Sequence, residues 1–201
     1  MTGRLTDKVT IVTGGNSGMG AGTVELFVSE GARVVIAARG EEAGQALADR
    51  LGENAIFIRT DVSVEAEVKA MIDTTVEKWG RVDVLFNNAG IGQPNLSPEE
   101  FTVEDFNQVL MTNLGSCFLG LKYVTPIMKK QGRGSIINNG SNNMRRHIIN
   151  NSYNSSDNNN ANINTSSNRS INSSNNYHRR ANRAINNIIT YISSSVSSNI
   201  N

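Results

Sequence analysis

A glycine-rich segment at residues 13–20 constrains the fold of this chain more than any other part of its sequence. It reads Thr-Gly-Gly-Asn-Ser-Gly-Met-Gly and follows a short apolar run at 9–12, which is typical of a buried strand. Apolar residues then recur at helical spacing over 21–30. The segment is therefore predicted to be a tight turn between a strand and a helix. An ordinary glycine turn without a ligand is the alternative interpretation.

The glycines at 14, 18 and 20 suit a turn that binds phosphate groups. Gly14 allows the chain to turn sharply, because glycine tolerates backbone angles that other residues avoid. Gly18 leaves room for a pyrophosphate beside the backbone, and Gly20 lets the helix pack closely on the strand. The N-terminus of the helix offers N–H groups and a partial positive charge to the phosphates.

The rest of the first 140 residues alternates between strands and helices. Apolar runs predict strands at 32–38, 55–58, 82–86 and 135–138, and periodic segments predict helices at 41–51, 64–79 and 102–131. The last helix is expected to bury Phe106, Leu110, Leu114, Leu121, Val124 and Met128. This alternation predicts an α/β fold of the Rossmann type, a doubly wound parallel sheet with strand order 3-2-1-4-5. A nucleotide would lie across the carboxyl ends of strands 1 and 4.

Three ordered motifs resemble those of the short-chain dehydrogenase/reductase family. The spacing T-G-x-x-x-G-x-G begins at Thr13, Asn-Asn-Ala-Gly occupies 87–90, and Asn113 precedes Leu114-Gly115. The resemblance covers about residues 5–141 and implies a dinucleotide-binding Rossmann domain over 1–141, with the family's last strands missing or scrambled. It also implies an NAD(P)-dependent oxidoreductase that transfers a hydride between a nicotinamide cofactor and a carbonyl or alcohol substrate.

The resemblance also implies a set of cofactor-binding residues. It places Gly14, Asn16, Ser17, Gly18, Met19 and Gly20 around the phosphates and the adenosine ribose, Asp61 and Val62 at the adenine, and Asn88, Ala89 and Gly90 along the adenosine side. A helix cap is the alternative role for Asp61.

The end of strand 2 predicts which nicotinamide cofactor is preferred. NAD enzymes usually carry a carboxylate there for the ribose 2′-hydroxyl. Here Ala38 is followed by Arg39, whose guanidinium suits a 2′-phosphate. We therefore expect NADP, with NAD as the alternative cofactor and a solvated arginine as the alternative role of Arg39.

The catalytic residues that the resemblance implies are Asn113, Ser141 and Tyr153. In the family a Tyr exchanges the proton, a Lys four residues later lowers the pKa of that Tyr, a Ser orients the substrate oxygen and an Asn supports a water. Here Asp157 stands in the place of the Lys, and no lysine follows Lys130. A neighbouring anion raises the pKa of a phenol. A nucleotide-binding protein with impaired turnover is therefore the second interpretation, and a chance tyrosine is the alternative for position 153.

Residues 142–201 differ in composition from the rest of the chain. From Ser141 onward more than half of the residues are Asn or Ser, and six arginines and one aspartate give a charge of +5, against −4 for residues 1–140. This composition predicts a degenerate or disordered tail. A reading-frame error is the other explanation, because residue types whose codons all end in a purine are absent after Met144. RNA binding or self-association through the tail is a third, less favoured function.

The bulk properties indicate one cytoplasmic domain. A chain of 201 residues can bury a sizeable core, and its net charge of +1 indicates no particular partner. The single cysteine, Cys117, cannot form an internal disulfide, and its apolar neighbours predict a buried thiol. No apolar run reaches membrane-spanning length, and no signal region is recognised at the start. We expect a small-molecule substrate, no membrane or nucleic-acid partner and no metal site; the family forms homo-oligomers.

Overall fold

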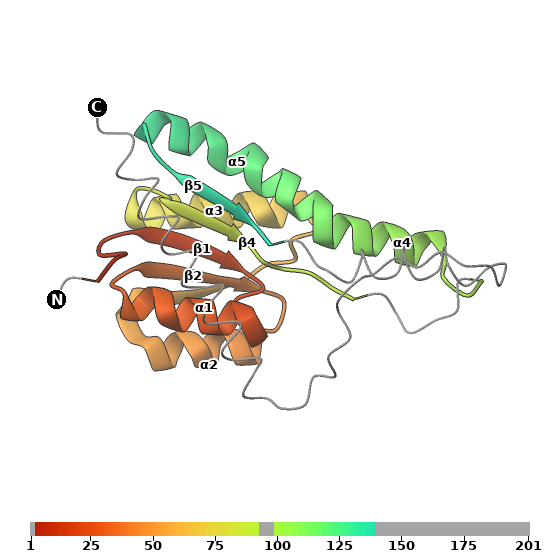
Figure 1. The fold of residues 1–201 in the computed structure, drawn as a ribbon, viewed down its shortest axis with the longest axis horizontal. Helices are drawn as coiled ribbons and strands as arrows, with labels where there is room; N and C mark the ends of the chain where they lie inside the picture. The colour runs from red at the N-terminus through yellow and green to blue at the C-terminus, as the bar shows by residue number, and fades with distance from the viewer. Residues whose placement is uncertain (1–2, 93–98, 140–201) are drawn as a thin grey trace, which may run out of the picture.

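The structure is a computed structural model that describes residues 3–92 and 99–139 (Figure 1). The strands are β1 (Val9–Thr13), β2 (Arg33–Ala38), β3 (Ala55–Arg59), β4 (Val84–Asn87) and β5 (Ser135–Asn138). The helices are α1 (Gly18–Ser29), α2 (Glu41–Leu51), α3 (Glu65–Trp79), α4 (Val103–Leu110) and α5 (Ser116–Gln131). A 3₁₀ turn, Gly52–Asn54, precedes β3, and a π-helical turn, Met111–Gly115, joins α4 to α5.

The strands form a parallel sheet in the order β3-β2-β1-β4-β5, which confirms the predicted order 3-2-1-4-5. The central strand β1 pairs with β2 on one side and with β4 on the other, so that Val12 lies beside both Ile36 and Phe86. The order of the strands reverses between β1 and β4. Their carboxyl ends are therefore the edge of the sheet at which a doubly wound fold holds its ligand.

Helices cover both faces of this sheet, as a buried parallel sheet requires (Figure 1). Val12, Ile36 and Phe86 point to the face covered by α1 and α2, where Phe27 is fully buried. Ile11, Val35 and Leu85, the neighbours of these residues in sequence, point to the opposite face, which α3 and α5 cover. This alternation explains the almost continuous apolar sequence of the strands, because both of their faces are buried.

Three helix ends are fixed by local capping residues. Thr102 caps α4 in a capping box with Asp105, whose backbone N–H donates to the Thr102 hydroxyl at 3.1 Å. Gly80 ends α3 and Gly132 ends α5, both in the left-handed conformation, with φ of 75° and 71°.

The prediction for the buried face of the 102–131 helix was partly wrong. Val124 and Met128 are buried as predicted, but Phe106, Leu114 and Leu121 are exposed. The side that faces the protein carries smaller residues, among them Thr112, Ser116 and Gly120. A side chain on Gly120 would lie 2.8 Å from Oδ1 of Asn87, so the close approach of α5 to β4 requires a small residue there. The more apolar stripe therefore faces outward, and Cys117 beside it is only half-buried.

Candidate functional site

A cavity of about 480 Å³ opens at the carboxyl ends of β1, β2, β3 and β4. Its wall is formed by the turn before α1 and by the segments that follow the other three strands. All twelve residues that the sequence predicts to bind a cofactor line this cavity: Gly14, Asn16, Ser17, Gly18, Met19, Gly20, Arg39, Asp61, Val62, Asn88, Ala89 and Gly90. The structure thus brings four separate segments together, while the contacts of each residue with a cofactor stay a prediction.

The three glycines of the turn occupy different environments. Gly14 has a φ of +64°, which only glycine adopts readily. A Cβ on Gly18 would meet no atom within 4 Å, so the backbone is open on that side. A Cβ on Gly20 would lie 2.0 Å from the carbonyl oxygen of Gly14, so that α1 can approach the turn only because residue 20 has no side chain. These are the turn, the open approach and the close packing that a pyrophosphate-binding turn needs.

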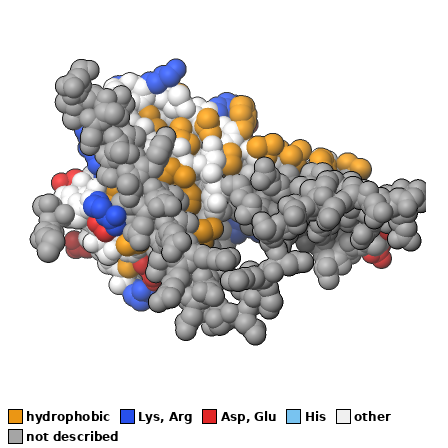
Figure 2. All heavy atoms as spheres, in the orientation of Figure 1, with side chains coloured by type: hydrophobic (Ala, Val, Ile, Leu, Met, Phe, Trp, Pro, Cys, Tyr) orange, Lys and Arg blue, Asp and Glu red, His pale blue; other side chains and the backbone are white. Residues whose placement is uncertain are grey.

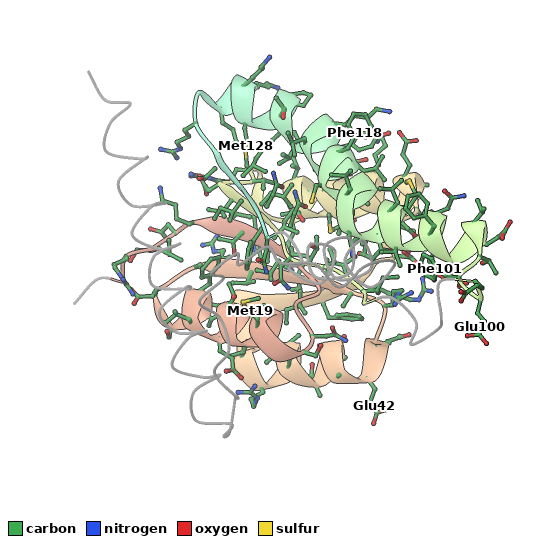
Figure 3. The ribbon with its side chains drawn as sticks, turned by 45° about the vertical axis from the view of Figure 1, so that its right-hand side comes forward. Met19, Glu42, Glu100, Phe101, Phe118 and Met128 are labelled. Carbon is green, nitrogen blue, oxygen red and sulfur yellow. The ribbon has the colours of Figure 1, made fainter. Side chains whose placement is uncertain are left out.

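The first turn of α1 points its dipole at the cavity, and Met19 lies in this turn (Figure 3). The first N–H groups of a helix have no partner within the helix. Ser17, the N-cap residue, makes no capping hydrogen bond with its side chain. The N–H groups and the dipole of α1 are therefore suited to an anion bound in the cavity.

Thr13 connects the glycine turn to the turn after β4. Its buried hydroxyl accepts hydrogen bonds from the backbone N–H groups of Asn88 and Ala89, at 2.9 and 3.0 Å. Asn88 in turn donates from its side chain to the carbonyl oxygen of Thr13 at 3.0 Å. The sequence places Thr13 in the motif but assigns it no role. Its role becomes visible only once β1 and β4 are known to be neighbours.

Asp61 lies on the wall of the cavity, and one oxygen of its carboxylate, Oδ1, is hydrogen-bonded within the protein. Its carboxylate accepts hydrogen bonds from the hydroxyl and the N–H group of Ser63, at 2.7 and 2.9 Å, and lies 4.0 Å from the guanidinium of Arg39. Partial burial opposes ionisation, but the Ser63 bonds and the cations of Arg39 and Arg59 outweigh it and lower the pKa of Asp61. Asp61 closes a turn before α3, and the N-cap residue of α3 is Val64. The alternative role of Asp61 as a helix cap is therefore wrong.

One more contact joins two of the segments that form the cavity. The side chain of Asn16 donates to the carbonyl oxygen of Gly40 at 3.3 Å and links the glycine turn to the segment after β2. Other residues that line the cavity but were not predicted to do so include Gly40, Thr60, Ile91 and Thr112. Each of these residues is adjacent in sequence to a predicted site residue, which lies near the end of a strand or in the π-helical turn. Closeness to the motifs is the only signal in the sequence that could have found them.

Asn113 lies in the π-helical turn and holds the backbone beside the cavity. Its Oδ1 accepts from the N–H group of Ile91 at 2.8 Å, and its Nδ2 donates to the Ile91 carbonyl oxygen at 3.0 Å. Single π-helical turns within α-helices occur frequently at functional sites. Asn113 thereby connects the helix pair α4–α5 to the segment that follows Gly90.

The sequence matches the family described as short chain dehydrogenase over residues 8–158. This match covers most of the chain, and it agrees with the strand order and the glycine turn. The chain belongs to the short chain dehydrogenase family. The match continues beyond Ser141, where the resemblance was predicted to end, and it includes Tyr153 and Asp157.

Curated proteins resemble the chain over two thirds to three quarters of its length. Tropinone reductase-like 2 of Erythroxylum coca is 50% identical over 138 residues, which are 67% of this chain and 50% of that protein. Levodione reductase of Leifsonia aquatica is 40% identical over 156 residues, 75% of this chain and 58% of that protein. The chain thus spans about half the length of the curated relatives it matches.

Solved structures of short chain dehydrogenases share the fold. A levodione reductase superposes with a TM-score of 0.62 at 37% identity, over 66% of this chain and 53% of that one. A 3-ketoacyl-(acyl-carrier-protein) reductase from Brucella melitensis, solved in complex with NADH, superposes with a TM-score of 0.61 at 34% identity, over 64% of this chain and 52% of that one.

The remaining predicted residues of the dehydrogenase site, Ser141 and Tyr153, lie outside the described residues, as does Asp157. The described part of the chain ends at Asn139, directly after β5. Within 3–92 and 99–139, no cluster of His, Cys, Asp and Glu could hold a metal ion. None of the helices in these ranges is long and apolar enough to cross a membrane.

Proposed function

We propose that this chain binds a nicotinamide dinucleotide in the cavity at the carboxyl ends of β1–β4 and belongs to an oxidoreductase that acts on a carbonyl or alcohol. The observation that carries the proposal is the meeting of twelve predicted residues, from four strand ends, around one cavity. The glycine turn supports it further, because the backbone at Gly18 is open and would let a pyrophosphate approach the first turn of α1.

Each part of the cavity suits one part of the dinucleotide. The N–H groups at the start of α1 would bind the pyrophosphate. Asp61 would accept a hydrogen bond from the exocyclic amine of adenine, since its lowered pKa keeps the carboxylate ionised at neutral pH. Ala89 and Gly90 would line the adenosine side. The nicotinamide supplies or accepts the hydride when it is bound.

The preferred cofactor in this proposal is NADP. The side chain of Arg39 is 54% exposed and lies on the rim of the cavity, so it can reach a 2′-phosphate without losing a buried partner. Ala38, the last residue of β2, offers no carboxylate for the 2′-hydroxyl of NAD. NAD is the alternative cofactor, and the structurally similar 3-ketoacyl-(acyl-carrier-protein) reductase from Brucella melitensis was solved in complex with NADH.

The catalytic residues in this proposal are Asn113, Ser141 and Tyr153. Asn113 has both ends of its side-chain amide bonded to Ile91, so it would act by holding the substrate side of the cavity in place. Tyr153 would exchange the proton with the substrate oxygen and Ser141 would orient that oxygen. Asp157, four residues after Tyr153, favours a second candidate, a nucleotide-binding protein with little turnover, because an anion disfavours the phenolate.

We also propose that two copies of the chain associate through an apolar ridge on α4 and α5. Side chains of Val103, Phe106, Leu114, Phe118 and Leu121 are 39–68% exposed and form this apolar ridge. Figure 2 shows apolar side chains in a row over α4, and in Figure 3 Phe118 projects away from the sheet. Acidic residues begin α4 and lysines end α5, so an antiparallel pairing would place opposite charges together.

We also propose a domain boundary and a location for the protein. The dinucleotide-binding domain would comprise residues 1–141, followed by a tail over 142–201, and the protein would act in the cytoplasm. A fluorescence titration with NADPH and NADH, followed by an assay with a panel of ketones, tests the proposed function. Binding with turnover supports the oxidoreductase, binding without turnover supports the second candidate, and the absence of binding contradicts both.

A further inference from the structure

The ends of three neighbouring strands are joined by a relay of side-chain amides. Asn139, directly after β5, donates from Nδ2 to Oδ1 of Asn88 at 3.1 Å. Asn88, directly after β4, donates from its own Nδ2 to the carbonyl oxygen of Thr13 at 3.0 Å and to that of Gly14 at 3.5 Å. The relay therefore runs from β5 through β4 to the first glycine of the phosphate-binding turn.

This relay has a direction that is set by the donor at position 139. Because Oδ1 of Asn88 accepts from Asn139, the Nδ2 of Asn88 faces the glycine turn. The space around this nitrogen is restricted, since a Cβ on Gly20 would lie 2.8 Å from it and a Cβ on Gly14 would lie 3.3 Å from it. The amide of Asn88 is thus both oriented and confined between the first and third glycines.

We propose that Asn139 is a positioning residue for the phosphate-binding turn, an inference that rests on the proposed cofactor function. Asn139 is itself held in place, because its backbone N–H donates to the carbonyl oxygen of Asn87 at 2.8 Å. Through Asn88 it holds the carbonyl groups on both sides of the sharp bend at Gly14. It thereby aligns the turn for the pyrophosphate without lining the cavity.

An aspartate at position 139 reverses the relay without changing the size of the side chain. A carboxylate accepts hydrogen bonds but does not donate them. Asn88 would have to flip its amide in order to donate to Asp, which would turn Oδ1 toward the carbonyl oxygens of Thr13 and Gly14. Acceptors that face each other lose their hydrogen bonds and repel, so the turn would move.

Asn138 provides a matched control one residue earlier in the chain. Its Oδ1 accepts from Nδ2 of Asn87 at 2.9 Å, so an aspartate at 138 keeps the acceptor and the hydrogen bond. Asn138→Asp and Asn139→Asp add the same charge at the same end of β5. Asn138→Asp keeps the acceptor that the native hydrogen bond needs, whereas Asn139→Asp replaces the native donor with an acceptor.

The experiment measures the dissociation constants of NADPH and of 2′-AMP for the full chain and for both variants. Asn139→Asp is expected to weaken NADPH binding about tenfold or more, and Asn138→Asp to leave it nearly unchanged. 2′-AMP has no pyrophosphate, so its affinity for Asn139→Asp should fall by a smaller factor than that of NADPH. Asn139→Ala removes the donor without adding a charge and should weaken NADPH binding by a smaller factor.

Equal NADPH affinities of the two aspartate variants would overturn the proposal. It would also be overturned if Asn139→Asp lost 2′-AMP binding by the same factor as NADPH binding, because that result indicates a general loss of the fold. Backbone amide resonances supply a readout that needs no cofactor. The resonances of Gly14 and Ala89 should shift in Asn139→Asp and stay in place in Asn138→Asp. Unchanged resonances in both variants would overturn the proposed relay. If the shifts occur but the parent chain binds no dinucleotide, the relay is supported and the proposed cofactor function is contradicted.

Discussion

The guanidinium of Arg39 lies 4.0 Å from the carboxylate of Asp61, across the ends of β2 and β3. Both side chains belong to the wall of the proposed cofactor cavity, and both are partly exposed. An ion pair at this distance and exposure contributes little to stability. Arg39 could therefore exchange Asp61 for a 2′-phosphate at low cost, and under the proposed function this pair would decide the cofactor preference.

Arg39→Ala is predicted to remove most of a preference for NADPH over NADH. A charge-assisted hydrogen bond to the 2′-phosphate contributes about 1.5–3 kcal/mol, so NADPH affinity should fall by about tenfold or more while NADH affinity changes little. Arg59→Ala is the matched control, because Arg59 also lies near Asp61 but pairs with Glu67 outside the cavity. Titrations of both cofactors check the prediction, which fails if the parent chain binds NADPH and NADH equally.

Gly18→Ala and Gly80→Ala distinguish the effect of backbone strain from the effect of lost space for the ligand. Both glycines have a positive φ, of 52° and 75°, and open space where a Cβ would be placed. Each substitution should therefore lower the free energy of unfolding, by about 1–2 kcal/mol. Only Gly18→Ala should weaken dinucleotide binding, because Gly18 lines the cavity and Gly80 does not. Denaturation curves and cofactor titrations test this pair, and an equal effect of both variants on affinity would refute the assignment of Gly18.

Turnover by the chain is predicted to be very low, and Asp157→Lys is predicted to raise it only if the segment around Tyr153 forms a helix. A cation beside Tyr153 favours the phenolate, and general acid–base help of this kind is commonly a factor of about 10²–10⁴ in rate. Rates of NADPH oxidation with a panel of ketones measure the effect, with Asp157→Asn as the control that removes the anion without adding a cation. An ordinary enzymatic rate for the parent chain would contradict the roles given to Tyr153 and Asp157.

The site was more predictable from the sequence than the packing of the long helix. The turn at Gly14 follows from local chemistry, because the glycines and the flanking strand and helix are adjacent in the chain. The link from Thr13 to Asn88 joins residues 75 positions apart, and no local pattern contains it. On α5, apolar residues recur at helical spacing on both the buried and the exposed face. The close contact of Gly120 with Asn87 decides which face is buried, and this contact exists only in the folded sheet.

Phe118→Glu is predicted to abolish self-association of the chain through the apolar ridge. Phe118 is 65% exposed, so the substitution should change the free energy of unfolding by less than about 0.5 kcal/mol. It would place a charge at the centre of an apolar contact between two copies. Phe118→Leu keeps the site apolar and should still associate. Sedimentation of the three proteins provides the measurement, and a parent chain that stays monomeric at high concentration rules out the ridge as an interface.

Binding of a nicotinamide dinucleotide in the cavity at the ends of β1–β4 can be measured by mapping NADPH binding on the backbone amide resonances of the parent chain. Saturable shifts are expected at Gly14, Asn16–Gly20, Asp61 and Asn88–Gly90, which line this cavity. The shallower hollow between α2 and β3, lined by Gln45 and Phe57, should show no shifts. Saturable shifts confined to that hollow, or no saturable shifts in the chain, would contradict dinucleotide binding in the cavity.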